Sequence, residues 1–266
     1  MIPTIGVFDS GLGGLTVLRE IHRQLPGISV LYLADTANVP YGDKPIEVVR
    51  DLALRLSDHL VMAGVSVIIM ASGTSTAAGL EAAQARYPDL PIVGTITPGA
   101  RAATLNSTGP IGVIATNATV QSLAFSQAVQ ALEPTRQVVE QGCPAFVPLV
   151  EAGRAESPEA DEAAFEYLVP LHKAGVQSVI LGCTHFPFLL PALHRAICRI
   201  GDPEFRPRFI DPSAEAVCDA ARVLQNSSNL LVGPSSFAAT SDPDLFRLHA
   251  SELLGETISN VEWLTL

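Results

Sequence analysis

A thiol, a hydroxyl and an imidazole follow the apolar run that ends at Leu181, as Cys183, Thr184 and His185. An imidazole beside a thiol can lower the thiol's pKa and assist proton transfer. A small buried cysteine next to a helix-capping threonine is the alternative, since a single cysteine usually serves packing. The position directly after an expected strand favours chemistry, because ligands bind beyond the carboxyl ends of parallel strands.

Asp9 and Ser10 follow the first expected strand and precede the glycine-rich run 11–14. The N–H groups of such a run, at the start of a helix, could form an anion site. An ordinary glycine-rich turn with Asp9 capping the helix is the alternative. The run matches neither the dinucleotide-binding fingerprint nor a P-loop.

Ser72, Gly73 and Thr74 open a hydroxyl cluster that offers hydrogen-bond donors to a carboxylate. No base lies beside Ser72 in the sequence and no G-x-S-x-G elbow surrounds it, which argues against serine hydrolysis. Glu151 follows an apolar run, where burial would raise its pKa. A glutamate in the first turn of a helix, without a catalytic role, is the alternative.

The composition narrows the class of protein. The 266 residues carry a formal net charge of −11 and are 48% hydrophobic, which favours a globular protein with a substantial core. No basic run is available to meet phosphates, so nucleic acid is not an expected partner. The cysteines show no metal-ligand spacing, so no metal is expected. We recognise neither a signal peptide nor a membrane-spanning stretch, and we expect a cytoplasmic protein with reduced cysteines.

Short β-branched runs alternate with amphipathic Ala/Leu-rich stretches along the chain. This alternation is typical of βαβ units and predicts an α/β fold with mostly parallel sheets. The expected strands are Thr4–Phe8, Val30–Leu33, Val65–Met70, Ile92–Gly94, Ile111–Ala115, Gln137–Gln141, Val176–Leu181, Phe209–Ile210 and Leu230–Val232. Examples of the expected helices are Thr16–Gln24, Ile46–Ala63, Val120–Ala131, Pro158–Ala174 and Ser213–Leu224.

The sequence also contains an internal repeat. Three pairs of segments match in order and at a nearly constant offset: 5–10 with 111–116, 39–40 with 147–148, and 63–72 with 174–183. We infer two similar α/β halves that face each other across a cleft. The repeat aligns Ser72 with Cys183, which would then line opposite walls of that cleft.

Five segments together resemble the glutamate racemase family, within the aspartate/glutamate racemase superfamily. They are IGVFDSGLGGLTVL, DTANVPYG, VGTITPGA, CPAFVPLVEAG and LGCTHFPFL, in the order that the family has them. The resemblance implies two similar three-layer domains related by a pseudo-twofold axis, with the active site in the cleft between them. The second domain, residues 97–208, would be inserted into the first, formed by residues 1–96 and 209–266.

The resemblance further implies a cofactor-independent enzyme that interconverts L- and D-glutamate and supplies D-glutamate for peptidoglycan. Its expected partners are a small dicarboxylate substrate and a second copy of the chain, with neither a membrane nor a nucleic acid. Family members move the α-proton with two cysteines on opposite faces of the substrate. By resemblance Cys183 is one of them, assisted by His185 and Glu151, and Asp9 assists the opposite position. The substrate-holding positions implied in the same way are Ser10, Pro40, Tyr41, Gly42, Gly73, Thr74, Thr119 and Thr184.

The opposite catalytic position departs from the family pattern, because Ser72-Gly73-Thr74 stands where the family has Cys-Asn-Thr. A hydroxyl is a far weaker acid than a thiol, so racemisation should be weak or strongly asymmetric. One alternative is a one-thiol member of the superfamily, such as a decarboxylase of malonate-type substrates, because loss of CO₂ needs a single proton donor. The other alternative is a homologue that binds a ligand without turning it over.

Overall fold

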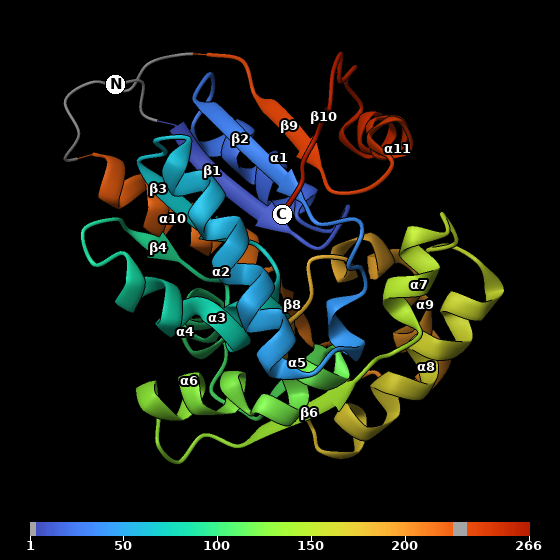
Figure 1. The fold of residues 1–266 in the computed structure, drawn as a ribbon. Helices are drawn as coiled ribbons and strands as arrows, with labels where there is room; N and C mark the ends of the chain where they lie inside the picture. Colours follow the sequence, from blue (N-terminus) through green and yellow to red (C-terminus); the bar gives the residue numbers. More distant parts are fainter. Residues whose placement is uncertain (1–3, 226–232) are drawn as a thin grey trace.

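Two parallel β-sheets organise the chain, one in each half of the molecule (Figure 1). The computed structural model describes residues 4–225 and 233–266. The first sheet has the strand order β10-β9-β2-β1-β3-β4 and the second has the order β6-β5-β7-β8. Every strand pair in these sheets is parallel. The carboxyl ends of the strands in each sheet therefore meet at one edge, where polar residues can converge.

The strands are short and mostly apolar. Those of the first sheet are β1 (Thr4–Asp9), β2 (Ser29–Ala34), β3 (Val67–Met70), β4 (Ile92–Val93), β9 (Ser236–Ala239) and β10 (Glu262–Trp263). Those of the second sheet are β5 (Ile111–Ala115), β6 (Val138–Gly142), β7 (Ser178–Leu181) and β8 (Arg208–Ile210). All expected strands from Thr4 to Ile210 are observed, with ends displaced by at most two residues.

The predicted repeat is present in the topology. The order β2-β1-β3-β4 in the first sheet corresponds to β6-β5-β7-β8 in the second. In register, Val7 pairs with Ile69 in the first sheet, as Val113 pairs with Ile180 in the second. The two halves are therefore built on one plan, and the residues after β3 and after β7 hold equivalent places.

Helices cover both faces of each sheet (Figure 1). Around the first sheet lie α1 (Leu15–Gln24), α2 (Ile46–Met62), α3 (Gly73–Arg86), α10 (Pro212–Leu224), α11 (Pro243–Leu254) and the short 3₁₀ helix η1 (Tyr41–Asp43). Around the second lie α4 (Ile96–Asn106), α5 (Asn117–Ser122), α6 (Ala124–Leu132), α7 (Phe146–Glu151), α8 (Pro158–Lys173), α9 (Leu190–Ile200) and the 3₁₀ helix η2 (Phe186–Leu189). This is the α/β fold that the sequence predicts.

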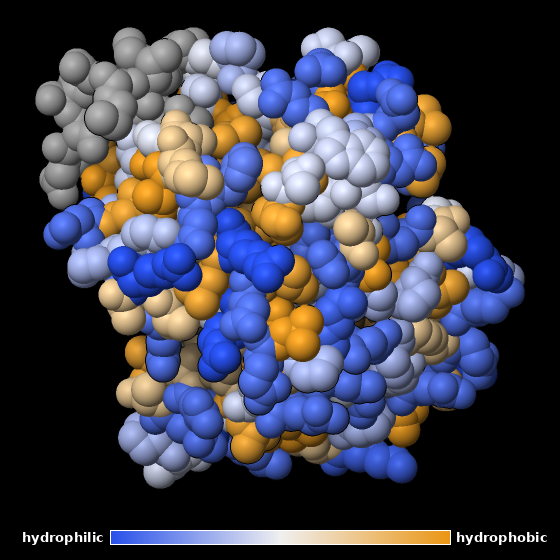
Figure 2. Space-filling model, viewed as in Figure 1, coloured by the Kyte–Doolittle hydropathy of each residue, from blue (hydrophilic) through white to orange (hydrophobic). Residues whose placement is uncertain are grey.

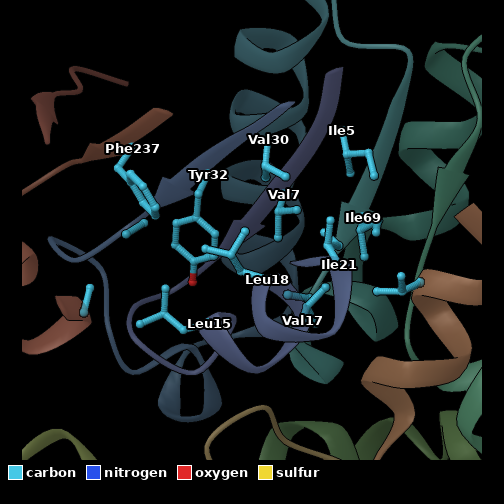
Figure 3. Packing of buried hydrophobic residues seen from close by; sticks show 14 of the residues in the cluster. Ile5, Val7, Leu15, Val17, Leu18, Ile21, Val30, Tyr32, Ile69 and Phe237 are labelled. Carbon is cyan, nitrogen blue, oxygen red and sulfur yellow. The ribbon is translucent and has the colours of Figure 1, made fainter. Parts of the chain in front are cut away.

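Alternation along the strands divides the core into layers. Ile5 and Val7 of β1 pack into the cluster formed with α1 and α10, whereas Phe8 packs into the cluster formed with α2. Tyr32 of β2 fills the first of these layers between the strands and α1 (Figure 3). Its hydroxyl donates to the carbonyl of Gly11 at 2.8 Å, so the core also fixes the glycine-rich loop. Burial of each such side chain contributes about 1.5–3 kcal/mol.

Two segments join the halves. The chain leaves the first sheet through α4 and returns after β8 through α10, and these two helices pack together. The Arg101 guanidinium of α4 forms an ion pair with Asp219 of α10 at 2.9 Å. Because β8 pairs with β7 in the second sheet, the expected domain boundary between residues 208 and 209 falls inside a strand. We propose that the return to the first domain begins after Ile210.

Two expectations about the elements, and one omission, need comment. The helix expected over Val120–Ala131 is wrong, because Leu123 adopts left-handed dihedrals (φ 55°) and separates α5 from α6. The Ser122 hydroxyl bonds to the backbone on both sides of this break and competes with the helical pattern. The strand expected over Leu230–Val232 lies outside the described residues. The sequence analysis did not foresee β9 or β10.

Hydrophobic residues on the face seen in Figure 2 are interspersed among hydrophilic ones. Among the residues that the structure describes, no helix is both long enough and apolar enough to cross a membrane.

Candidate active site

The Cys183 sulfur lies at the end of a hydrogen-bonded chain of ionisable groups. Its partner is Nδ1 of His185 at 3.7 Å, and Nε2 of His185 lies 2.6 Å from Oε1 of Glu151. His185 is 2% exposed. The β7 strand ends two residues before Cys183, so the sheet delivers the thiol to the edge where parallel strands present ligands. The structure thus brings together the three residues that the sequence analysis assigned to this face.

The charges of His185 and Glu151 follow from the contacts of these two side chains. Burial alone would lower the pKa of His185, but its hydrogen bonds and charge interactions with Cys183 and Glu151 raise that pKa well above the usual range. Burial would raise the pKa of Glu151, as the sequence analysis expected, yet that expectation is wrong. The hydrogen bond from His185, its positive charge and the Leu12 amide outweigh burial, and the pKa of Glu151 is lowered. The pair is therefore an imidazolium and a carboxylate.

Asp9 occupies the equivalent edge of the first sheet, at the end of β1. It is fully buried, and its Oδ1 accepts from the Gly11 amide at 3.1 Å and from the Ser10 hydroxyl at 3.3 Å. Its Oδ2 accepts from the Thr184 hydroxyl at 2.9 Å. This last bond crosses from one half of the molecule to the other, so Thr184 ties the two halves together beside Cys183.

The pKa of Asp9 is raised. Burial is the main cause and the nearby charge of Glu151 adds to it, while the charge of His185 and the hydrogen bonds from Gly11 and Thr184 oppose it. Asp9 therefore holds a proton more readily than an exposed aspartate. It does not cap a helix, because α1 begins after Gly14 without a side-chain cap.

The glycine-rich loop binds a carboxylate of the protein itself, that of Glu151. The first amides of α1 are bonded within the loop, Leu15 to the Leu12 carbonyl and Thr16 to the Gly13 carbonyl, each at 3.1 Å. The Leu12 amide instead donates to Oε1 of Glu151 at 3.4 Å. The anion site expected from the sequence is thus occupied by a carboxylate from the other half, at the end of α7.

Ser72 lies at the start of α3, two residues after β3. Its Oγ accepts from the Ser75 amide at 3.3 Å, which makes it the N-cap of the helix, and it is 7% exposed. An oxygen that accepts a backbone N–H keeps its own O–H free to donate. A Cβ at Gly73 would overlap the carbonyl oxygen of Gly182, so the residues beside Ser72 and Cys183 touch. The two halves therefore meet where the repeat predicts.

Three buried threonine hydroxyls converge between the halves. Thr74 of α3 lies 3.0 Å from Thr116 and 3.1 Å from Thr119, which are 3.0 Å from each other. The sequence analysis named Thr74 and Thr119 but missed Thr116. The internal repeat carried the signal, because it aligns Ser10 with Thr116.

The loop after β2 approaches the same place. A Cβ at Gly42 would lie 2.6 Å from Cβ of Thr116, so this glycine packs against α5 of the other half. The Tyr41 hydroxyl donates to Oδ2 of the buried Asp35 at 2.6 Å. Pro40 precedes η1 and is partly exposed, and its peptide bond with Val39 is cis.

A small cavity lies beside Cys183, with a volume of about 10 Å³. Its lining includes Gly73 and Thr95 from one half and Gly182 and Thr184 from the other. This volume is about that of one water molecule. Within the described part of the chain, no cluster of three or more His, Cys, Asp or Glu side chains is arranged to hold a metal ion.

The family is decided by the match of residues 5–220 to the Asp/Glu/Hydantoin racemase family. The chain belongs to this racemase family. A glutamate racemase of Microcystis aeruginosa is 43% identical over 259 residues, which cover 96% of this chain and 88% of that protein. Among solved structures, the glutamate racemase isoform RacE1 of Bacillus anthracis has a TM-score of 0.91 at 32% identity, over 99% of this chain and 98% of that one.

A third relative is described with a ligand. The glutamate racemase of Francisella tularensis, described in complex with D-glutamate, has a TM-score of 0.88 at 28% identity and covers 99% of this chain and 97% of its own. Membership in the racemase family confirms the resemblance found in the sequence.

Proposed function

We propose that this chain is a cofactor-independent glutamate racemase that interconverts L- and D-glutamate and supplies D-glutamate for peptidoglycan. The observation that carries the proposal is the Cys183–His185–Glu151 chain, joined to the first half by the Thr184–Asp9 hydrogen bond. The glutamate racemases similar to it over nearly the whole chain support the choice of substrate.

On the Cys183 face, the charges suit removal of a proton. The His185 imidazolium carries protons on both nitrogens, so it donates Nδ1–H toward the sulfur and Nε2–H to Glu151. A sulfur in this setting accepts the α-proton of glutamate as a thiolate and becomes a thiol. Its partner imidazolium stays charged throughout, because Glu151 holds it.

Removal of the α-proton places negative charge on the substrate carboxylate, and that charge must be stabilised. We propose that the hydroxyls of Thr74, Thr116 and Thr119 donate to the substrate. Ser10, Pro40, Tyr41, Gly42, Gly73 and Thr184 are the further substrate-holding positions of this proposal. Tyr41 contributes through its backbone, since its hydroxyl is bound to Asp35.

On the opposite face, the Ser72 hydroxyl or a water molecule returns the proton. The pKa of Asp9 is raised, so this carboxylate takes up a proton more readily than an exposed aspartate and can pass it to the Ser72 oxygen after transfer. A serine hydroxyl is a much weaker acid and a rarer base than a thiol. We therefore expect exchange to be faster for the enantiomer whose α-proton faces Cys183.

The test follows α-proton exchange in D₂O by NMR, starting separately from L- and D-glutamate. The expected result is fast exchange from one enantiomer and slow conversion into the other. Fast and equal exchange from both would show that Ser72 does not limit the reaction. No exchange from either, at any pH, would refute racemase activity, and calorimetry with both enantiomers would then show whether the chain only binds them.

Decarboxylation of a malonate-type substrate is the competing activity, because the site presents one thiol beside a cluster of hydroxyls. Release of CO₂ from a substituted malonate by the unaltered chain, without exchange of either glutamate, would favour it. A large gain in racemisation on Ser72→Cys would favour the racemase.

We further propose that the chain acts in the cytoplasm as a homodimer. The four cysteines, all free thiols in the structure, suit a reducing compartment, and the family resemblance supports the dimer. Light scattering after size-exclusion chromatography tests the assembly against the 28.0 kDa mass of one chain.

A further inference from the structure

Four glycines of the first half face the chemical groups of the second half. At each of them a Cβ would crowd a residue across the contact between the halves. The pairs are Gly11 with Glu151, Gly13 with Thr184 and His185, Gly42 with Thr116, and Gly73 with Gly182. The two halves can therefore lie this close together because these four positions carry no side chain.

Gly73 differs from the other three in what it meets. The others face side-chain atoms, whereas a Cβ at Gly73 would overlap the backbone carbonyl oxygen of Gly182. That backbone is fixed, because the Gly182 amide donates to the Ile114 carbonyl of β5 at 2.7 Å. Phe125 and Ala115 also pack against Gly182, since a Cβ there would lie 2.9 Å and 3.0 Å from them. A side chain at position 73 therefore pushes the halves apart.

This contact lies beside both reacting positions. Gly73 follows Ser72 directly, and Gly182 precedes Cys183. The Gly73–Gly182 contact therefore sets how closely the two catalytic side chains approach a substrate held between them. A serine reaches less far than a cysteine, because the C–O bond is shorter than the C–S bond and oxygen is smaller than sulfur.

We propose that Gly73 is a positioning residue that brings Ser72 closer to the substrate and so offsets the shorter reach of the hydroxyl. The inference rests on the proposed racemase activity, and it makes Ser72 and Gly73 a coupled pair. A residue with a Cβ at position 73 suits a cysteine at position 72, and a glycine suits a serine.

The experiment places Gly73→Ala in two backgrounds, the unaltered chain and the Ser72→Cys variant. Alanine adds only a Cβ and favours the helix that begins there, so a loss cannot come from a weakened α3. With Ser72 in place, exchange on its face should fall by about 10- to 100-fold, since a shift of about 1 Å can cost that much. In the Ser72→Cys background the same substitution should raise it.

Gly79→Ala is the matched control. Gly79 lies in the same helix, but a Cβ there would meet Ala53 of α2 within the first half, at 2.9 Å. Its effect should have the same sign and size in both backgrounds. If Gly73→Ala also acts equally in both backgrounds, the coupling does not exist and the proposal is wrong.

Crystal structures of the unaltered chain and of Gly73→Ala provide a readout that does not depend on activity. The distance from Ser72 to Cys183 should be larger in the variant, and an unchanged distance would overturn the proposal. If neither the unaltered chain nor any of the variants exchanges the α-proton of either enantiomer, the proposed function is wrong. The comparison of the two crystal structures would still decide the role of Gly73.

Discussion

Replacing Thr184 by valine tests the hydrogen bond that joins the halves. Valine keeps the shape of threonine but removes the hydroxyl that donates to Oδ2 of the fully buried Asp9 at 2.9 Å. A hydrogen bond to a charged group contributes about 1.5–3 kcal/mol, against about 0.5–1.5 kcal/mol for a neutral one. Thr184→Val should therefore lower the free energy of unfolding by about 1.5–3 kcal/mol where Asp9 is ionised.

The pH dependence of this loss gives the sharper test. The pKa of Asp9 lies above its ordinary value of 3.8, so ionised Asp9 costs stability, and that cost appears as pH rises through the folded pKa. Thr184 reduces the cost by favouring the charged form. Thr184→Val raises the pKa further, so its penalty should be largest at pH values above the folded pKa of Asp9. The penalty should shrink to that of a neutral hydrogen bond as pH falls through the pKa of Asp9 in the folded chain, because the carboxyl is then protonated with or without Thr184.

Urea denaturation of the unaltered chain and the variant, at several pH values, measures the effect. Thr16→Val is the matched control, because the buried Thr16 hydroxyl donates to the neutral Gly13 carbonyl at 3.0 Å. Its penalty should be smaller and should not change with pH. Equal and pH-independent penalties for the two variants would refute the argument that Asp9 carries a buried charge stabilised by Thr184.

The remaining predictions concern the reacting groups. Glu151→Gln should move the alkaline limb of the exchange rate to lower pH, because His185 loses the carboxylate that raises its pKa; Glu156→Gln, nearby on the surface, should not. Ser72→Cys should raise racemisation by several powers of ten, yet lower the unfolding free energy by about 1 kcal/mol, because cysteine is a poor N-cap; equal stability by denaturation would contradict the capping role. Cys183→Ser should abolish exchange of the enantiomer that reacts fast, whereas Cys198→Ser, at an exposed thiol, should leave it intact.

The fold was largely predictable because strand–helix alternation and the internal repeat report burial directly. Apolar runs such as Val67–Met70 are buried on both faces of a sheet and stand out in the sequence. By contrast, β9 is short and alanine-rich and gains its place by pairing with β2. Such long-range pairing leaves little trace in local composition.

The site was predictable in its members but not in its contacts. The sequence placed Cys183 and His185 together, since they are neighbours in the chain. It could not show that Glu151 forms an ion pair with His185, and therefore gave the wrong direction for the pKa of Glu151. Nor could it show that the Tyr41 hydroxyl is bound to Asp35, because that contact depends on how the loop folds back.

The place of β9 also bears on how the chain is made. β9 (Ser236–Ala239) lies beside β2 near the start of the chain (Figure 1), and Phe237 packs against Tyr32 (Figure 3). Phe246 stacks on the same ring. During synthesis the second sheet, which ends at Ile210, is complete before β9 leaves the ribosome. The half that begins the chain is therefore the last to finish folding, and a protein truncated before residue 236 would leave the β2 edge and the Tyr32 ring exposed to aggregation.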